Sequence, residues 1–245
     1  MTVQITVIGS SPAWPNPGGA HSGYLFEAGG RRLLVDCGPG VLPRLREREP
    51  WPEIDAIAIT HFHLDHWGDL VPWVWGSFYR RSGGNEPLRP ELWVHPRGRA
   101  HLEELGGRLG FPDMFERAFD LRAYDDDESF TTAGFDVLPL RLPHYTLETY
   151  GFRIGSGAVT VAYSGDSGPS ERLADLAHDA DLFLCEATLE HGDLDGEPRG
   201  HLSAEEAIAA FAASGARRLV LTHRPCELAT PPGIELASDG MVLTL

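Results

Sequence analysis

The feature that most constrains this chain is a set of ligand-type side chains that directly follow apolar, strand-like runs. Four such runs, well separated along the sequence, lead to His61, His144, Asp166 and His223. In layered α/β proteins the strand ends converge at one edge of a sheet, so residues far apart in sequence meet there. A lone histidine after a strand is more often structural than functional, but four residues in the same position indicate one shared site. We therefore predict an α/β fold with a metal site at a sheet edge.

The strongest local motif is the segment Thr-His-Phe-His-Leu-Asp-His at residues 60–66. His61 and His63 are two residues apart at a strand end, so their side chains point the same way, whereas Asp65 and His66 project from the turn that follows. Imidazole suits zinc, iron and manganese, and a carboxylate beside it allows a second metal position. A polar turn rich in histidine is the alternative, but it gives this spacing no packing purpose. The motif therefore predicts ligands for two adjacent ions.

Length and composition limit the architecture. The chain has 245 residues, of which 42% are hydrophobic, and we expect one domain over residues 1–245. No stretch approaches the length of a membrane span, and a strand pattern begins at Val3, so we predict a cytoplasmic protein. The three cysteines are scattered and in no paired spacing, which supports neither a disulfide framework nor a structural zinc site.

The formal net charge of -16 bears on the partner. Nucleic-acid affinity comes mostly from clustered basic groups that neutralise phosphates, and an acidic chain opposes binding to an extended polyanion. We therefore expect a small-molecule substrate, and neither a nucleic acid nor a membrane as partner.

Two segments predict helices outside the ligand pattern. Residues Asp69–Arg81 carry apolar side chains on more than one face of a helix, which fits core packing or, as a hypothesis, a homodimer interface. Residues His101–Phe119 predict a helical insertion that is broken by the glycines and the proline between residues 106 and 112.

The His-x-His-x-Asp-His run, followed by distant His, Asp and His at strand ends, resembles the metallo-β-lactamase superfamily over essentially the whole chain. The resemblance implies a four-layer αββα sandwich with a dinuclear site at one edge of the sheets. It implies one ion held by His61, His63 and His144, a second held by Asp65, His66 and His223, and Asp166 bridging both. We expect two divalent ions, with zinc first and manganese or iron as alternatives. Two ions roughly 3.5–4 Å apart lower the pKa of a shared water, so hydrolysis needs no protein nucleophile. Asp36 we interpret as support for a ligating histidine or as a turn cap.

A narrower resemblance lies in Glu186-Ala187-Thr188 and His201-Leu202-Ser203, which are similar to motifs of the ribonuclease Z-like phosphodiesterase branch. Ser203 with Glu206 also forms a capping box that opens a predicted helix over residues 204–213. The resemblance implies that His201 assists the leaving oxygen or the phosphoryl charge and that Glu186 orients it; the alternative is a capping segment with an incidental surface histidine. We expect Asp65, Glu186 and His201 to be the catalytic residues.

The departures from ribonuclease Z affect the expected substrate. That enzyme inserts a long arm that grips transfer RNA, whereas here only two predicted strands, Thr149–Ile154 and Ala158–Tyr163, separate His144 from Asp166. We therefore predict a small phosphodiester, first a cyclic nucleotide, with transfer-RNA 3′ processing as the alternative. Lactone or thioester hydrolysis and a non-catalytic metal-binding module stay open as other classes. We expect contacts with the base or sugar to come from loops such as Ser10–His21 and Arg80–Glu91, and the sequence assigns no role to His21.

Overall fold

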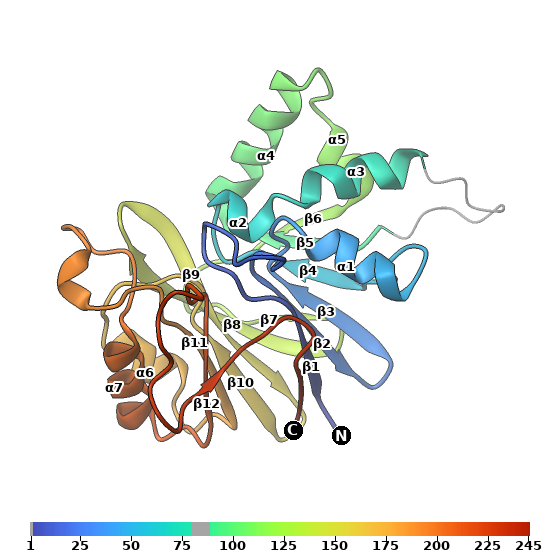
Figure 1. The fold of residues 1–245 in the computed structure, drawn as a ribbon. Coiled ribbons are helices and arrows are strands. Elements are labelled where there is room, and N and C mark those ends of the chain that lie inside the picture. The colour runs from blue at the N-terminus through green and yellow to red at the C-terminus, as the bar shows by residue number, and fades with distance from the viewer. Residues whose placement is uncertain (1, 80–88) are drawn as a thin grey trace.

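Two β-sheets packed face to face form the centre of the structure, and helices cover their outer faces (Figure 1). The computed structural model describes residues 2–79 and 89–245, and within these ranges each sheet has seven strands. The first sheet has the order β14 (Val242–Thr244), β1 (Gln4–Gly9), β2 (Gly23–Ala28), β3 (Arg31–Val35), β4 (Ala56–Ala58), β5 (Glu91–Val94) and β6 (Asp120–Ala123). The second has the order β13 (Glu235–Leu236), β12 (Leu219–Thr222), β11 (Leu182–Glu186), β10 (Val159–Tyr163), β9 (Leu147–Ser156), β8 (Phe135–His144) and β7 (Phe130–Thr132).

The helices divide between the two outer faces. Those beside the first sheet are α1 (Val41–Arg48), α2 (Leu64–Trp67), α3 (Leu70–Tyr79), α4 (Pro96–Arg108) and α5 (Met114–Ala118). Those beside the second sheet are α6 (Arg172–Leu176) and α7 (Ala204–Ser214), and a short 3-10 helix, η1 (Gly192–Leu194), precedes α7. This is the predicted αββα sandwich, so the expected fold class is confirmed.

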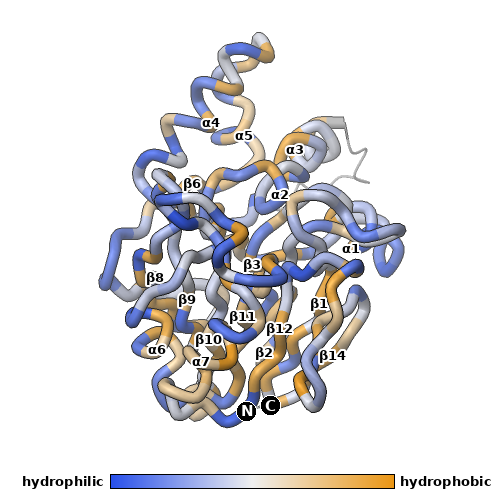
Figure 2. Tube along the Cα trace, turned by 60° about the vertical axis from the view of Figure 1, so that its left-hand side comes forward, coloured by the Kyte–Doolittle hydropathy of each residue, from blue (hydrophilic) through white to orange (hydrophobic). Residues whose placement is uncertain are grey.

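Three apolar clusters hold the layers together. The central cluster lies between the sheets and includes Phe26 and Phe152, which are fully buried. A second joins the first sheet to its helices through Trp67 and Trp73, and a third joins the other sheet to α6 and α7. In Figure 2 the strands β1 and β2 are largely hydrophobic in colour, as strands buried on both faces must be. Burial of this apolar surface is the main driving force for forming the sandwich.

The strand ends lie where the sequence predicts them. Strand β8 ends at His144, β12 ends immediately before His223, and β10 ends three residues before Asp166. Strands β10, β11 and β12 are parallel, so their carboxyl ends reach the same edge of the second sheet. Strand β4 brings His61 to the adjoining edge of the first sheet.

Helix α3 confirms the helix predicted near residues 69–81, although Arg80 and Arg81 lie outside the described residues. Its buried residues Leu70, Trp73 and Val74 belong to the cluster beneath the first sheet, and partly buried neighbours pack against the same cluster. Core packing thus accounts for many of the apolar side chains on more than one face of α3, and the homodimer interface stays a prediction.

The insertion between β5 and β6 differs from the prediction in one respect. Helix α4 begins at Pro96, a favoured first position, and continues through Gly106 instead of breaking there. A Cβ at Gly106 would lie 2.7 Å from the carbonyl oxygen of Phe111, so glycine permits the returning chain to approach the helix. The helix ends at Arg108, and the chain turns at Gly110, one of the predicted break positions, whose φ of +81° places it in the left-handed region.

Across the described residues, no helix is long and apolar enough to cross a membrane.

Candidate metal centre

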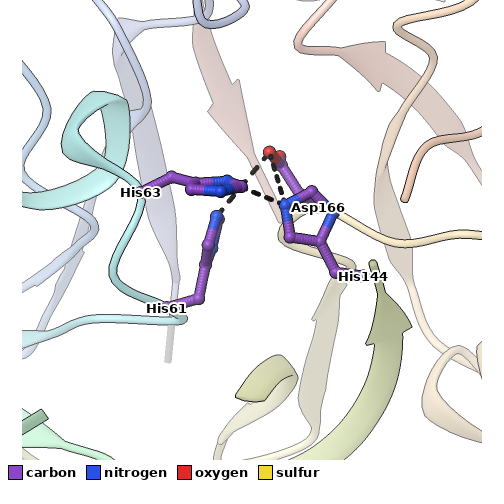
Figure 3. Close-up of side chains that lie close together, drawn as sticks. All are labelled: His61, His63, His144 and Asp166. Atoms are coloured by element: carbon purple, nitrogen blue, oxygen red, sulfur yellow. Dashed lines mark hydrogen bonds and ion pairs between the residues drawn. The ribbon is translucent and has the colours of Figure 1, made fainter. Parts of the chain in front are cut away.

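Strand ends from both sheets, together with helix α2, bring all seven predicted ligands together. They form two groups whose ligand atoms lie within 4.8 Å of one another, and Asp166 belongs to both. The groups are His61, His63, His144 and Asp166, and Asp65, His66, Asp166 and His223. Figure 3 shows the first group, with His61 and His63 opposite His144 and Asp166 and their polar atoms directed at a common space. These His/Asp clusters can bind metal.

Three buried polar atoms without hydrogen-bond partners indicate whether the two ligand groups suit cations. His61 Nε2, His66 Nε2 and Asp166 Oδ1 are buried and have no hydrogen-bond partner among the described residues. His66 Nε2 and Asp166 Oδ1 lie 3.2 Å apart, which is close enough for an ion pair, but their relative orientation does not form a hydrogen bond. Buried polar atoms are rarely left without partners, and imidazole with carboxylate is a donor set for divalent transition metals. The residues present therefore fit divalent cations.

Asp36 orients His66 by a hydrogen bond on the side of the ring that faces away from the site. Its Oδ2 accepts a hydrogen bond of 2.8 Å from His66 Nδ1, which directs His66 Nε2 at the site. The same carboxylate accepts hydrogen bonds from Thr60 N at 2.9 Å and from Tyr163 OH at 3.0 Å. Such outer partners fix the ring orientation of ligating histidines. The predicted supporting role of Asp36 agrees with this geometry.

Two further histidines are oriented through their Nδ1 atoms. His144 Nδ1 donates to the carbonyl oxygen of Gly200 at 2.6 Å. His223 Nδ1 lies 2.9 Å from Thr188 Oγ1, whose own proton is donated to Glu186 Oε2 at 2.8 Å, so His223 is the donor. In both residues Nε2 is therefore directed at the site.

Three of the six non-glycine residues with positive φ in the described part of the chain lie at the same place. Asp36, His223 and Tyr145 have φ values of 58°, 53° and 49°, in the left-handed region that non-glycine residues avoid. Each of these conformations costs of order 1–3 kcal/mol and persists only where the surroundings determine it. All three residues hold or adjoin predicted ligands.

Burial and charge set the protonation of the ligand groups. Burial lowers the pKa of His61 well below its usual range and that of His144 to about 4, so both rings are neutral and keep a lone pair. Burial alone would raise the pKa of Asp166, but His223 and His66 outweigh it and hold that pKa well below its usual range. Burial opposes the charged form of His66, yet Asp166 and Asp36 raise its pKa well above the ordinary value. A bound cation would compete with the proton on His66, because metal binding requires neutral imidazole.

His201 lies beside both ligand groups and not on an open surface. Its ring centroid is 4.9 Å from that of His144 and 5.8 Å from that of His223. Its Nδ1 donates to Glu186 Oε1 at 2.9 Å, and this fully buried carboxylate outweighs desolvation and raises the pKa of His201 to about 9. The capping box between Ser203 and Glu206 is present as predicted, and Ser203, two residues after His201, is the N-cap of α7. The contact with Glu186 thus favours the protonated form of His201, which lies beside the ligand groups.

A cavity of about 1000 Å³ opens over these groups. Its polar floor includes His63, Asp65, Asp166 and His201. The remaining walls are mainly apolar and aromatic, and include Ala13, Trp14, Pro39, Phe62, Leu64, Trp67, Leu105, Tyr145, Leu189 and Leu194. This combination of apolar walls and a few convergent polar groups is typical of small-molecule sites.

Some cavity residues had no assigned role in the sequence-based prediction. His21 lies in the cavity wall; its Nδ1 donates to the carbonyl oxygen of Pro12 at 2.9 Å, and burial lowers its pKa. Thr188, which joins His223 to Glu186, was visible as the third residue of the Glu-Ala-Thr motif but had no role. Trp14 belongs to no motif, and nothing local identifies it.

The two-sheet sandwich and its edge cluster of histidines and aspartates define a metallo-hydrolase fold. The model of the beta-lactamase superfamily domain matches residues 31–224, and the chain belongs to this superfamily.

The relatives support the same class. The probable metallo-hydrolase YhfI of Bacillus subtilis (strain 168) is 31% identical over 227 residues, which cover 91% of this chain and 87% of that protein. The crystal structure of YhfI has a TM-score of 0.83 at 27% identity and covers 98% of this chain and 99% of that one. A Ribonuclease Z of Mycolicibacterium paratuberculosis is 28% identical over 244 residues, covering 90% of this chain and 85% of that protein.

A more distant structural neighbour is unliganded yeast PDE1. It has a TM-score of 0.74 at 15% identity and covers 100% of this chain and 99% of that one. At this identity the likeness concerns the fold alone.

Proposed function

We propose that the chain is a metal-dependent phosphodiesterase that hydrolyses a small phosphodiester, with a cyclic nucleotide as the first substrate to test. The observation that carries the proposal is the pair formed by Glu186 and His201, which presents a protonated imidazole to the cavity that Asp65 and Asp166 also line. A proton donor beside clustered cation ligands suits a reaction in which an oxygen leaves from phosphorus.

We assign the two ions to the two groups described above, with Asp166 shared, and expect zinc first. When bound, divalent cations acidify water and stabilise negative charge on phosphoryl oxygens. The chain's own residues then have separate tasks.

His201 donates its proton to the leaving oxygen as the bond from phosphorus to that oxygen breaks. Because Nδ1 is committed to Glu186, the proton comes from Nε2, and Glu186 stabilises the charged ring beforehand. Asp65 lines the cavity, and although burial raises its pKa, His66 and His223 outweigh this and hold it well below the usual range. Its carboxylate is therefore anionic and can orient the attacking water and accept its proton. The products are a phosphomonoester and an alcohol.

The absence of an inserted arm favours a small substrate over transfer RNA. All 21 residues between His144 and Asp166 are described, and β9 and β10 occupy 15 of them. The net charge of -16 also opposes binding to a long polyanion. The likeness to a Ribonuclease Z keeps RNA cleavage as the second candidate.

A metal-by-substrate screen tests the proposal. Purified protein loaded with zinc, manganese or iron would be assayed on 2′,3′- and 3′,5′-cyclic nucleotides, bis(p-nitrophenyl) phosphate, a precursor transfer RNA, a lactone and a thioester. We expect phosphodiester hydrolysis that depends on added metal and changes little with salt. Carboxylic-ester or thioester hydrolysis with none on phosphodiesters would contradict the proposal, and cleavage confined to the precursor RNA would favour the second candidate.

A further inference from the structure

A second, smaller cavity adjoins the one over the ligand groups. Its volume is about 320 Å³, and it shares Trp14, Thr188, Leu189 and Leu194 with the larger cavity as common walls. Trp14 is 52% exposed and Leu194 is 64% exposed, which is unusual for such large apolar side chains. Contiguous exposed apolar surface at a cavity mouth marks a binding site.

The shared wall lies on the side of His201. Asp195, the neighbour of Leu194, accepts hydrogen bonds from Gly200 N at 2.7 Å and from His201 N at 3.1 Å. Thr188 donates to the same Glu186 that orients the His201 ring. A group attached to an oxygen that binds beside His201 would therefore extend toward this wall.

The segment that carries Trp14 is held at both of its ends. Two residues after Trp14, Asn16 donates through Nδ2 to the carbonyl oxygen of Arg224 at 3.1 Å and accepts from Cys226 N at 2.8 Å. The Asp239 carboxylate accepts hydrogen bonds from Ser10 N at 3.1 Å and Ala20 N at 2.7 Å. The tryptophan is thus mounted on a loop whose position is fixed in advance, which reduces the entropy cost of binding.

The charges around the shared wall indicate which kind of ligand group can bind there. The charged side chains that line the smaller cavity are acidic, Glu190 and Glu227, and Asp195 lines the larger one. No arginine in the described part of the chain lines either cavity. Further phosphates would be repelled there, whereas an uncharged flat group would stack on the indole and bury apolar area.

We propose that Trp14, Leu189 and Leu194 form a subsite for an uncharged aromatic group on the leaving alcohol, such as a nucleobase. The inference rests on the proposed phosphodiesterase activity, since it is that reaction that places a leaving oxygen beside His201.

The test compares two substrates that differ only in the size of the leaving group. Methyl phenyl phosphate and methyl naphthyl phosphate release phenols of similar acidity, so a difference in kcat/KM reports contacts with the extra ring. We expect the metal-loaded protein to prefer the naphthyl ester, and Trp14→Ala to reduce this preference by about tenfold, mainly through KM, because an extra ring buries tens of Å² of apolar surface. Leu194→Ala should reduce it less, and Trp14→Phe should restore much of it.

Leu109→Ala is the matched control, because Leu109 is another leucine with an exposed side chain and lies outside both cavities. It should leave the preference unchanged. A preference that survives both Trp14→Ala and Leu194→Ala while phosphodiesterase activity persists would overturn the subsite and leave the proposed function standing.

If neither these esters nor any phosphodiester of the screen is cleaved, the proposed function fails, and the two esters are then compared as ligands of the metal-loaded protein by calorimetry. Tighter binding of the naphthyl ester that Trp14→Ala abolishes would uphold the subsite independently of catalysis. Equal binding of the two esters would overturn it.

Discussion

The floor and the mouth of the large cavity are built in opposite ways. The floor consists of polar residues from strand ends and from α2, and beneath it His61 and His66 are fully buried, with their Nδ1 atoms within hydrogen-bond distance of Thr60 Oγ1 and Asp36 Oδ2. The mouth consists of loops that present exposed apolar side chains such as Trp14 and Leu194. Strand ends fix the geometry that the chemistry needs, whereas loops can change without disturbing it. The difference suggests that the reaction is determined by the floor and the substrate by the mouth.

The largest expected effect comes from replacing Asp166, the floor residue that belongs to both ligand groups. Asp166→Ala should empty or scramble both metal positions, because its carboxylate belongs to both ligand groups, and activity should fall to background. Elemental analysis of the purified variant checks this, with Asp175→Ala, an exposed aspartate on α6, as the control. Two metals per chain in Asp166→Ala would show that Asp166 is not a common ligand.

The next effect separates chemistry from metal binding within the floor. His201→Ala should keep the metal content while lowering turnover by about 10²–10⁴, the usual range for a general acid or a charge stabiliser. His178→Ala, at a histidine whose side chain is 74% exposed, serves as the control in the same steady-state assay. An unchanged rate in His201→Ala would reduce His201 to a structural element.

A smaller effect is expected where a hydroxyl supports a ligand. Thr188→Val preserves shape but removes the hydrogen bonds to His223 Nδ1 and Glu186 Oε2. Metal affinity should fall by about 10–100-fold, as is typical for loss of an outer partner. Competition with a chelating dye measures it, and Thr131→Val, at an exposed threonine of β7, is the control. Full affinity in Thr188→Val would mean that His223 is oriented without this contact.

The smallest effect should arise at the mouth. Asn16→Ala removes the two hydrogen bonds that tie the Trp14 loop to residues 224–226. We expect KM for an aromatic phosphodiester to rise by roughly twofold to tenfold with little change in metal content, because an ordered loop binds at lower entropy cost. Loss of metal from this variant would contradict the separation of floor and mouth.

The sequence predicted that the seven ligand-type residues lie together because the signals are local. Four of them follow apolar runs and the other three lie in the motif at residues 60–66, so each signal is visible within about ten residues. The mouth was not predictable in this way, since the contact that positions Trp14 joins Asn16 to Arg224, 208 positions away. The break predicted at Gly106 is absent for the same reason, because the contact that explains this glycine comes from residues that follow the helix.

Glu186 has a wider consequence for the floor. One of its oxygens receives the His201 proton donor, and the other receives Thr188, which in turn holds His223. If one of these four side chains is displaced, the others must find new hydrogen-bond partners or lose their hydrogen bonds. The four side chains therefore behave as a cooperative network. Energies measured by replacing them one at a time will therefore not sum, and only double-mutant cycles can apportion the catalytic advantage between proton transfer and cation retention.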